Sequence, residues 1–482
     1  MLFNSLGFAL FFPVVFFLYW FVARNNLKAQ NFILLVASYF FYACWDYRFL
    51  FLLIFSTFLD YFTGLKIHEA KTTGLKRLWL FISVFINLGF LGFFKYYNFF
   101  IDSFASVLNS VGFKADIWTL QIILPVGISF YTFHGMSYVF DIYNKKVVPR
   151  TNFINYSVFV SYFPLLVAGP IERATHLLPQ IESPRKFDYT KAVDGLRQIL
   201  WGFFKKIVIA DNCATYVNMI FDNYADHSGS TLVLGALFFA FQIYGDFSGY
   251  SDIALGTSRL LGIELLRNFS FPYFSRDIAE FWRRWHMSLS SWFRDYLYIP
   301  LGGSKGGTWM KIRNTFIIFL VSGFWHGANW TFIVWGALNA IYFLPLLLLE
   351  KNRSNLDIVA QGKLLPSFKE AIGMAVTFGL TVFAWIFFRS ATVADALFYI
   401  KGIFSPTLFS FPQVISGETV PLLICLILFV LIEWLQRDKK HALQIEGVFP
   451  YRFVRWNIYV VLACLIYYVG NFGHHAFIYF QF

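Results

Sequence analysis

Long apolar runs separated by shorter polar segments recur along the whole chain. Residues 7–23, 231–256, 371–388 and 456–470 are examples, and few of their positions carry a charge. A helix needs about 20 apolar residues to cross a hydrocarbon core of about 30 Å. Because only helices and closed barrels satisfy their backbone groups in lipid, runs of this length predict membrane-spanning helices. The pattern therefore predicts an all-α polytopic membrane protein.

The polar segments between these runs alternate in charge, which indicates an orientation. Residues 24–28, 66–77 and 141–150 are basic, whereas residues 102–116 contain little charge. Basic loops tend to stay in the cytoplasm, so we expect the N-terminus outside. A last basic run at 437–441, followed by one more apolar run, places the C-terminus outside as well.

One segment does not fit a simple succession of spans. Residues 152–169 lead to the charged stretch 172–197, which cannot lie outside without breaking the alternation, so a re-entrant segment is predicted. We expect roughly eleven transmembrane helices, with re-entrant and interfacial helices in addition. No repeat of fixed period divides the chain, so one membrane domain is the economical interpretation. That domain would cover 1–482, with N-terminal helices (1–150), a core (151–350) and C-terminal helices (351–482).

The composition agrees with a lipid environment. The 482 residues are 58% hydrophobic and 14% charged, whereas a soluble domain has about 25% charged residues. The net charge of +12 need not indicate nucleic-acid binding, because basic cytoplasmic loops produce the same excess. Cys44, Cys213, Cys425 and Cys464 are isolated in or near apolar runs, so neither a metal site nor a disulfide framework is expected.

The stretch SGFWHGANW (322–330) places an ionisable residue, His326, in a strongly apolar region. The preceding apolar arm, 314–325, has 12 residues, which as a helix is about 18 Å long and too short to cross. A turn at 323–327 would leave His326 within the membrane, at the tip of a broken hairpin. An ionisable residue at that depth is a candidate functional residue. The alternative is a neutral structural histidine bonded to a carbonyl group.

A second unusual segment covers residues 276–304, where aromatic and charged residues are mixed. It is too polar to span and too apolar for a free loop, so we expect it to lie in the membrane interface or to dip into the membrane. Arg283, Arg284, Arg294 and Lys305 could hold phosphate groups in charge-assisted contacts. The alternative is that these cations rest on lipid headgroups or pair with nearby acids.

These two segments carry a resemblance to a known family. The motif FWRRWHMSLSSWFRDYLYIPLGGS (281–304), followed by SGFWHGANWTFIVWGALNA (322–340), resembles the membrane-bound O-acyltransferase family in its bacterial polysaccharide O-acetyltransferase branch. Further stretches similar to this branch lie at 124–143, 162–173, 244–256 and 383–390. The resemblance covers nearly the whole chain and implies helices arranged around a central tunnel. His134 departs from the pattern, which has glutamine there.

The resemblance implies transfer of an acyl group from a thioester to a hydroxyl. The histidine matching His326 is catalytic in the family, and the one matching His286 lies nearby. With an ordinary pKa near 6.5, His326 would take the proton of the attacking hydroxyl, while His286 would orient or assist. The implied donor is acetyl-CoA, whose phosphates would suit the basic stretch 276–305. No metal and no permanently bound cofactor are implied.

The expected function is that of an acyltransferase subunit in the inner membrane, passing acetyl groups to an exported polysaccharide, most like the alginate type. The expected partners are an outward-facing esterase-like acetyltransferase of the SGNH class, the polysaccharide acceptor and membrane lipids, and no nucleic acid. A peptidoglycan O-acetyltransferase subunit and a D-alanyl transfer protein are alternatives. From a different class, a transporter would use His326 as a proton relay, but only one clear hairpin is found.

The last six residues, FIYFQF (477–482), contain no charge and follow the closing apolar run. They resemble the C-terminal end of the small membrane peptide that accompanies D-alanyl transfer proteins, where a tyrosine is proposed to carry the acyl group. We therefore expect the tail to fold back toward an outward-facing cavity near His326, with Tyr479 as an acyl relay. The alternative is an aromatic anchor, with Tyr479 at the level of the lipid headgroups.

Overall fold

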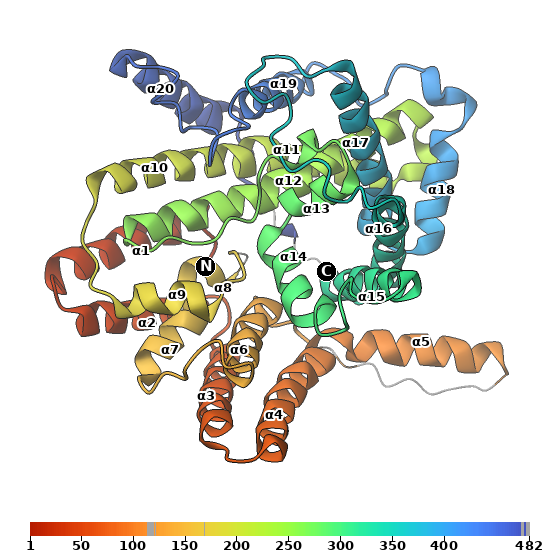
Figure 1. Ribbon diagram of the computed structural model, residues 1–482. Coiled ribbons are helices and arrows are strands. Elements are labelled where there is room, and N and C mark those ends of the chain that lie inside the picture. Colours follow the sequence, from red (N-terminus) through yellow and green to blue (C-terminus); the bar gives the residue numbers. More distant parts are fainter. Residues whose placement is uncertain (113–119, 121, 168, 474–476, 479–482) are drawn as a thin grey trace. The chain divides into compact units, whose positions relative to one another are not determined.

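The chain folds into two compact units. Figure 1 labels their helices in chain order. A computed structural model describes residues 1–482 except 113–119, 121, 168, 474–476 and 479–482. The first unit contains Met1–Asp188 and Ser258–Leu265, and the second contains Tyr189–Thr257 and Leu266–Phe482. This division falls near residue 188 instead of near 150 and 350, and the expectation of one membrane domain stays a prediction.

In both units the regular secondary structure of the described residues consists of helices, as the apolar pattern predicts. The first unit contains α1 (Leu6–Phe17), α2 (Leu27–Ala43), α3 (Tyr47–Glu69), α4 (Thr73–Leu91), α5 (Tyr97–Ser110), α6 (Ile128–Tyr143), α7 (Phe153–Ser161), α8 (Phe163–Leu166) and α9 (Ala174–Glu182). The second contains α10 (Tyr189–Phe203), α11 (Asp211–Asp222), most of α12 (Gly229–Leu260), α13 (Ile278–Arg284), α14 (Met287–Phe293), α15 (Thr308–His326), α16 (Trp330–Leu348), α17 (Phe368–Arg389), α18 (Val393–Ile403), α19 (Val420–Leu435) and α20 (Arg452–Val469).

Polar caps decide where many of these helices begin. The side chains of Asn26, Asp46 and Thr72 accept hydrogen bonds from backbone N–H groups in the first turns of α2, α3 and α4. Asn329 caps α16 in the same way, and Ser367 opens α17 with a capping box. Each cap satisfies N–H groups that have no partner within the helix, so short polar segments divide the apolar sequence into separate helices.

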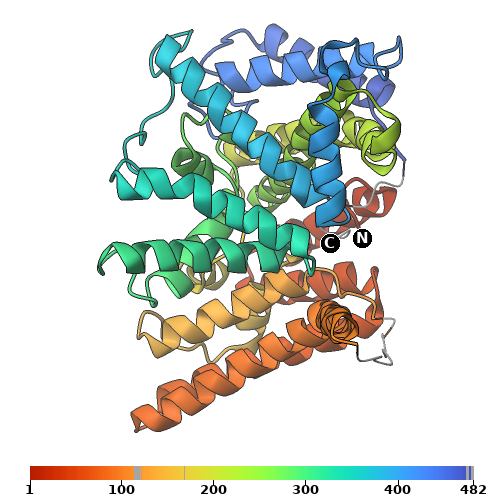
Figure 2. The same cartoon turned by 90° about the vertical axis from the view of Figure 1, so that its right-hand side faces the viewer.

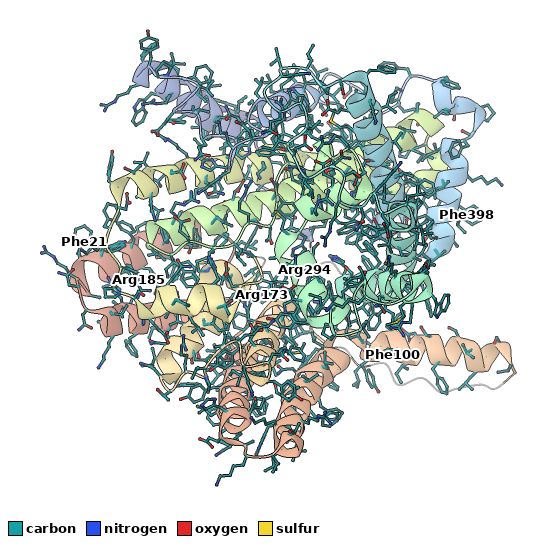
Figure 3. The ribbon with its side chains drawn as sticks, viewed as in Figure 1. Phe21, Phe100, Arg173, Arg185, Arg294 and Phe398 are labelled. Atoms are coloured by element: carbon teal, nitrogen blue, oxygen red, sulfur yellow. The ribbon has the colours of Figure 1, made fainter. Side chains whose placement is uncertain are left out.

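Several helices are long and apolar enough to cross a membrane, so the protein is a multi-pass membrane protein. Within the described residues there are six such stretches: α3, α4 continuing into α5 (Thr73–Ser110), α12, α16, α17 and α20. Two shorter apolar helical stretches are Leu6–Val22 and Val420–Leu435. Large apolar side chains such as Phe21, Phe100 and Phe398 are 65%, 56% and 59% exposed (Figure 3), which suits contact with lipid. Fewer helices satisfy these criteria than the roughly eleven expected, because many of the core helices are short.

A continuous helical stretch, Tyr189–Asp222, crosses the second unit beside α12 (Figure 1). It is interrupted by a π-helical segment, Phe204–Ala210, between α10 and α11. Such a segment widens the helix by one residue per turn and re-aims its side chains. Here it contains Lys205 and Lys206, which are both buried.

Helices α15 and α16 form a tight antiparallel hairpin, and Figure 2 shows them side by side. Gly323 and Gly336 lie at the contact, where an added Cβ would overlap backbone oxygens of the opposite helix. The predicted hairpin is therefore present, but its first arm is 19 residues long rather than 12. As a 19-residue helix this arm is about 28 Å long, but it is not among the described stretches that are both long and apolar enough to cross a membrane, so the expectation that it does not cross stays a prediction. The helix begins before the apolar run. Asn314 donates to the carbonyl of Gly303, and this contact supports the polar first turns of α15.

Candidate active site

His326 is the last residue of α15 and lies in an aromatic environment in the second unit. It is 3% exposed, and its ring centroid lies 5.2 Å from that of Trp335 on α16 and 5.4 Å from that of Phe388 on α17. Gly327 ends the helix in extended backbone, and only two further residues precede α16. The hairpin thus holds the imidazole where three helices meet.

His286 lies between α13 and α14 and is 1% exposed. Its backbone has φ +43°, a left-handed conformation that is strained for a residue with a side chain. Asn268 stabilises this turn, because its carbonyl accepts from the Met287 N–H and its side chain accepts from Ser288 Oγ. Among the described residues, neither ring nitrogen of His286 has a hydrogen-bond partner. Burial lowers the pKa of His286 to about 3, so the ring is neutral at physiological pH.

One side chain, Trp325, contacts both histidines. Its ring centroid lies 4.9 Å from that of His326 and 6.0 Å from that of His286, and the His286 centroid lies 4.6 Å from that of Phe247 on α12. The structure therefore brings the two sequence-predicted histidines into one group of side chains. We refer to this group as the histidine cluster: Phe247, His286, Trp325, His326, Trp335 and Phe388.

The C-terminal tail enters the same region of the second unit. Phe477 and Ile478 are each 1% exposed, so these two residues are buried as the expected fold-back requires. The Phe477 ring lies 4.9 Å from Tyr250 and 6.1 Å from Phe247, a member of the histidine cluster. The Ile478 N–H donates to Asp246 Oδ2 at 2.7 Å. Tyr479 lies outside the described residues, and its predicted role as a relay stays a prediction.

A buried ionic cluster, Lys206, Asp211 and Asp246, holds this part of the tail. Lys206 Nζ lies 2.9 Å from Asp246 Oδ1 and 2.7 Å from Asp211 Oδ1. All three residues are at most 4% exposed. None of these three residues was predicted from the sequence, although a signal was present: lysines within an apolar helix, followed by Asp211 and with Asp246 on a neighbouring apolar helix, mark an intramembrane ionic site.

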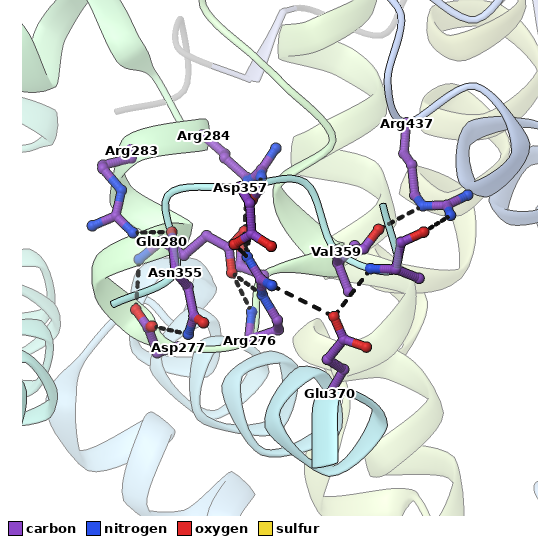
Figure 4. Close-up of polar contacts among 12 residues, drawn as sticks. Arg276, Asp277, Glu280, Arg283, Arg284, Asn355, Asp357, Val359, Glu370 and Arg437 are labelled. Atoms are coloured by element: carbon purple, nitrogen blue, oxygen red, sulfur yellow. Dashed lines mark hydrogen bonds and ion pairs between the residues drawn. The ribbon is translucent and has the colours of Figure 1, made fainter. Parts of the chain in front are cut away.

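Two of the four predicted phosphate-binding cations are already engaged with the protein (Figure 4). Arg283 donates to the carbonyls of Asn352 and Asn355 at 2.7 and 2.6 Å. Arg284 forms an ion pair with Glu280 at 2.8 Å. The Arg283 contacts, with a further one from Arg284 to the carbonyl of Asp357 at 3.1 Å, attach the segment 276–284 to the connection between α16 and α17.

Arg276, which was not among the predicted site residues, completes this network. Its guanidinium pairs with Glu280 at 3.0 Å, with Asp357 at 2.9 Å and with Glu370 at 3.5 Å. By contrast, the Arg294 side chain is 62% exposed beside Asp295, and Lys305 is exposed. Arg294 and Lys305 are therefore the more accessible of the predicted cations, and phosphate binding by any of the four stays a prediction.

The geometry suits proton transfer in a dry environment. Two imidazoles lie among aromatic side chains, and His286 has no hydrogen-bond partner for either ring nitrogen within the part of the chain that the structure describes. Within the described residues, no group of three or more His, Cys, Asp or Glu side chains could hold a metal ion. A histidine in such surroundings can act as a general base toward a hydroxyl group.

Comparison with known proteins gives consistent matches. The sequence model of MBOAT, the membrane-bound O-acyltransferase family, matches residues 126–371, a range that contains both histidines. The probable alginate O-acetylase AlgI of Pseudomonas aeruginosa is 40% identical over 398 residues, which cover 82% of this chain and 73% of that protein. The peptidoglycan O-acetyltransferase of Helicobacter pylori is 36% identical over 84% of this chain and 80% of its own length. The teichoic acid D-alanyltransferase of Streptococcus thermophilus is 30% identical over 60% of this chain and 75% of its own length.

Proposed function

The chain belongs to the membrane-bound O-acyltransferase family, and on this basis we propose that it transfers acetyl groups across the inner membrane to an exported polysaccharide of the alginate type. The observation that carries the proposal is the histidine cluster, which joins the two family-motif histidines through Trp325. The 40% identity to a probable alginate O-acetylase supports the alginate type. Both termini would lie on the outer side of this membrane.

His326 acts as the general base in this proposal. Its imidazole takes the proton of an attacking hydroxyl while the oxygen forms a bond to the thioester carbonyl carbon. The carbon–sulfur bond then breaks, and the imidazolium returns the proton to the leaving thiolate. The aromatic side chains around His326 limit access of water that would hydrolyse the thioester.

His286 positions the reacting groups. Because burial keeps its imidazole neutral, it can donate through one nitrogen and accept through the other. Both nitrogens lack partners among the described residues, so a substrate carbonyl or hydroxyl would be a suitable partner. This arrangement supports a role in orienting the donor beside His326.

The C-terminal tail carries the acetyl group in transit. Phe477 and Ile478 are buried beside Phe247, and Tyr479 follows directly in the chain. A phenol has an ordinary pKa near 10, so a histidine base activates it more easily than an aliphatic hydroxyl, and the aryl ester remains reactive. Acetyl would pass from the thioester to the Tyr479 oxygen and then to an outer hydroxyl.

Acetyl-CoA is the proposed donor, held through its phosphates by Arg294 and Lys305, with Arg283 and Arg284 supporting the segment. Coenzyme A then stays in the cytosol, since only the acetyl group moves inward. The proposed outer partner is an SGNH-type acetyltransferase that delivers acetyl to the polysaccharide. A peptidoglycan acceptor is the second candidate, favoured by the 36% identity to the Helicobacter pylori enzyme.

The test supplies radiolabelled acetyl-CoA to inside-out vesicles with the outer acceptor withheld. We expect label on the C-terminal peptide at Tyr479, identified by mass spectrometry, and loss of label in Tyr479→Phe, which keeps the aromatic ring. Phe472→Ala, an exposed position on the same tail, is the control. Normal acetyl transfer by Tyr479→Phe would end the relay, and absence of any transfer from acetyl-CoA by the wild type would end the proposed donor.

A further inference from the structure

The first unit contains a buried arginine, Arg185, that has no acidic partner among the residues the structure describes. Arg185 follows α9 and is 8% exposed, and its guanidinium lies 5.4 Å from the centre of the Tyr19 ring. One terminal nitrogen donates to Asn31 Oδ1. Among the described residues, the buried Nε and Nη1 atoms have no hydrogen-bond partner. Figure 3 marks Arg185 beside the helices of the first unit.

The polar groups around Arg185 are committed to one another. Asn31 Nδ2 donates to the carbonyl of Ile181 at 2.9 Å, and the Tyr19 hydroxyl donates to that of Leu261 at 3.0 Å. The Tyr162 hydroxyl shares a hydrogen bond with Ser258 at 3.0 Å. These contacts fix the walls around the guanidinium but bring no negative charge to it.

Nearby acids have cations of their own. Glu182 lies 2.7 Å from Arg150, and Glu264 lies 3.3 Å from Arg259. Among the described residues, no carboxylate lies within ion-pair distance of Arg185. A buried cation without a counter-ion is strongly destabilising, so its retention here needs an external anion.

The remaining donors of Arg185 fit one class of ligand. The N–H groups of a planar guanidinium that remain after the contact with Asn31 match the oxygens of a phosphate in charge-assisted hydrogen bonds. Lys186, next to Arg185, and Arg24, five residues after Tyr19, are exposed, and the Phe187 ring lies 5.5 Å from that of Trp20. The π-helical segment Leu18–Val22 contains Tyr19 and also Phe21, whose side chain is 65% exposed. A basic and aromatic rim beside exposed apolar side chains is typical of a phosphate group at a membrane interface.

We propose that Arg185, together with Asn31 and Tyr19, forms a binding site for a phosphate ester in the first unit. The phosphate comes from a phospholipid headgroup or from a soluble phosphorylated molecule, since both present the same oxygens to the guanidinium. The site is independent of the histidine cluster, whose residues all belong to the second unit.

The experiment uses the full-length protein in detergent and two probes, phosphatidylglycerol and inorganic phosphate. Native mass spectrometry measures lipid adducts, and thermal unfolding measures stabilisation by each probe, with diacylglycerol as the lipid without phosphate. We expect Arg185→Gln to weaken binding at least tenfold, while Lys186→Gln, at the adjacent exposed position, changes it less than twofold. Stabilisation by phosphatidylglycerol alone identifies the lipid source, and stabilisation by inorganic phosphate identifies a soluble one.

Equal binding of both probes by wild type and Arg185→Gln would overturn the proposal, as would stabilisation by diacylglycerol equal to that by phosphatidylglycerol. If Arg185→Gln fails to fold, Arg185→Lys replaces it. Lysine keeps the charge but loses the planar pair of donors, so we expect phosphate affinity to fall about threefold to tenfold. An Arg185→Lys protein with wild-type affinity and no preference for phosphate would also overturn the site.

Discussion

Phe477→Ala should release the C-terminal tail from the second unit. The Phe477 side chain is 1% exposed, against Tyr250 at 4.9 Å and Phe247 at 6.1 Å, so truncation removes nearly all of its buried apolar surface. Full burial of a phenylalanine stabilises by about 2–3 kcal/mol. Since about 1.4 kcal/mol corresponds to a tenfold change in an equilibrium constant, the docked state should weaken roughly 30- to 140-fold.

Hydrogen exchange at the Ile478 amide measures this weakening of tail docking directly. That amide donates to Asp246 Oδ2 at 2.7 Å in a buried position, so it exchanges only when the tail opens. We expect its exchange rate in Phe477→Ala to rise by the same factor, measured by mass spectrometry of the C-terminal peptide. Exchange reports docking itself, whereas acetyl transfer falls only once the undocked tail predominates.

Phe472→Ala is the matched control, because Phe472 lies on the same tail but is 63% exposed. Its substitution should leave the exchange rate of the Ile478 amide within about threefold of the wild-type rate, since little apolar burial is lost. An Ile478 amide that exchanges equally fast in Phe477→Ala and in the wild type would refute the docking argument. Equal acceleration by both substitutions would refute it too, because burial would then not be the cause.

Three further predictions concern the histidine, the cations and the ionic cluster. His326→Ala should lower acetyl transfer by about 10²- to 10⁴-fold without loss of the inserted protein, and wild-type rates in a vesicle assay would contradict its role as base. Arg294→Ala should raise the apparent KM for acetyl-CoA with little change in kcat, whereas Arg283→Ala should lower the thermal unfolding midpoint because two carbonyls lose their donor; equal KM values in both variants would contradict this division. Asp246→Asn should destabilise the protein by about 3 kcal/mol, as breaking a buried ion pair does. Asp222→Asn, whose carboxylate is 62% exposed beside Arg389, should cost less than about 1 kcal/mol, and similar unfolding midpoints would contradict the importance of burial.

The local pattern of the sequence was sufficient for several features of this protein. Runs of apolar residues predicted helices and a membrane environment, because both depend on residues close together in the chain. The α15–α16 hairpin followed from the glycines and polar residues at 323–329. The motif containing His286 and that containing His326 identified the family and the two histidines. Such features can be predicted without knowing which helices contact one another.

Helix ends and side-chain partners depended on contacts that the local pattern does not contain. The length of the apolar run 314–325 is shorter than that of α15, because the polar first turns of this helix are held by the loop at Gly303. Similarly, Arg283 looked like a ligand-binding residue from its charge, yet it donates to carbonyls about 70 residues away along the chain.

The sequence alone thus determined the class of protein and the residue types at its centre, since hydropathy and motifs act locally. Only the tertiary structure decided that Trp325 joins two histidines 40 residues apart, and that Asp246 meets both Lys206 and the tail at Ile478. The physical reason is that a buried charge or hydrogen-bonding group needs a partner, but many residues in the chain could supply one. The packing of helices that are distant in sequence selects the partner. For Arg185 this packing brings no negatively charged partner among the described side chains.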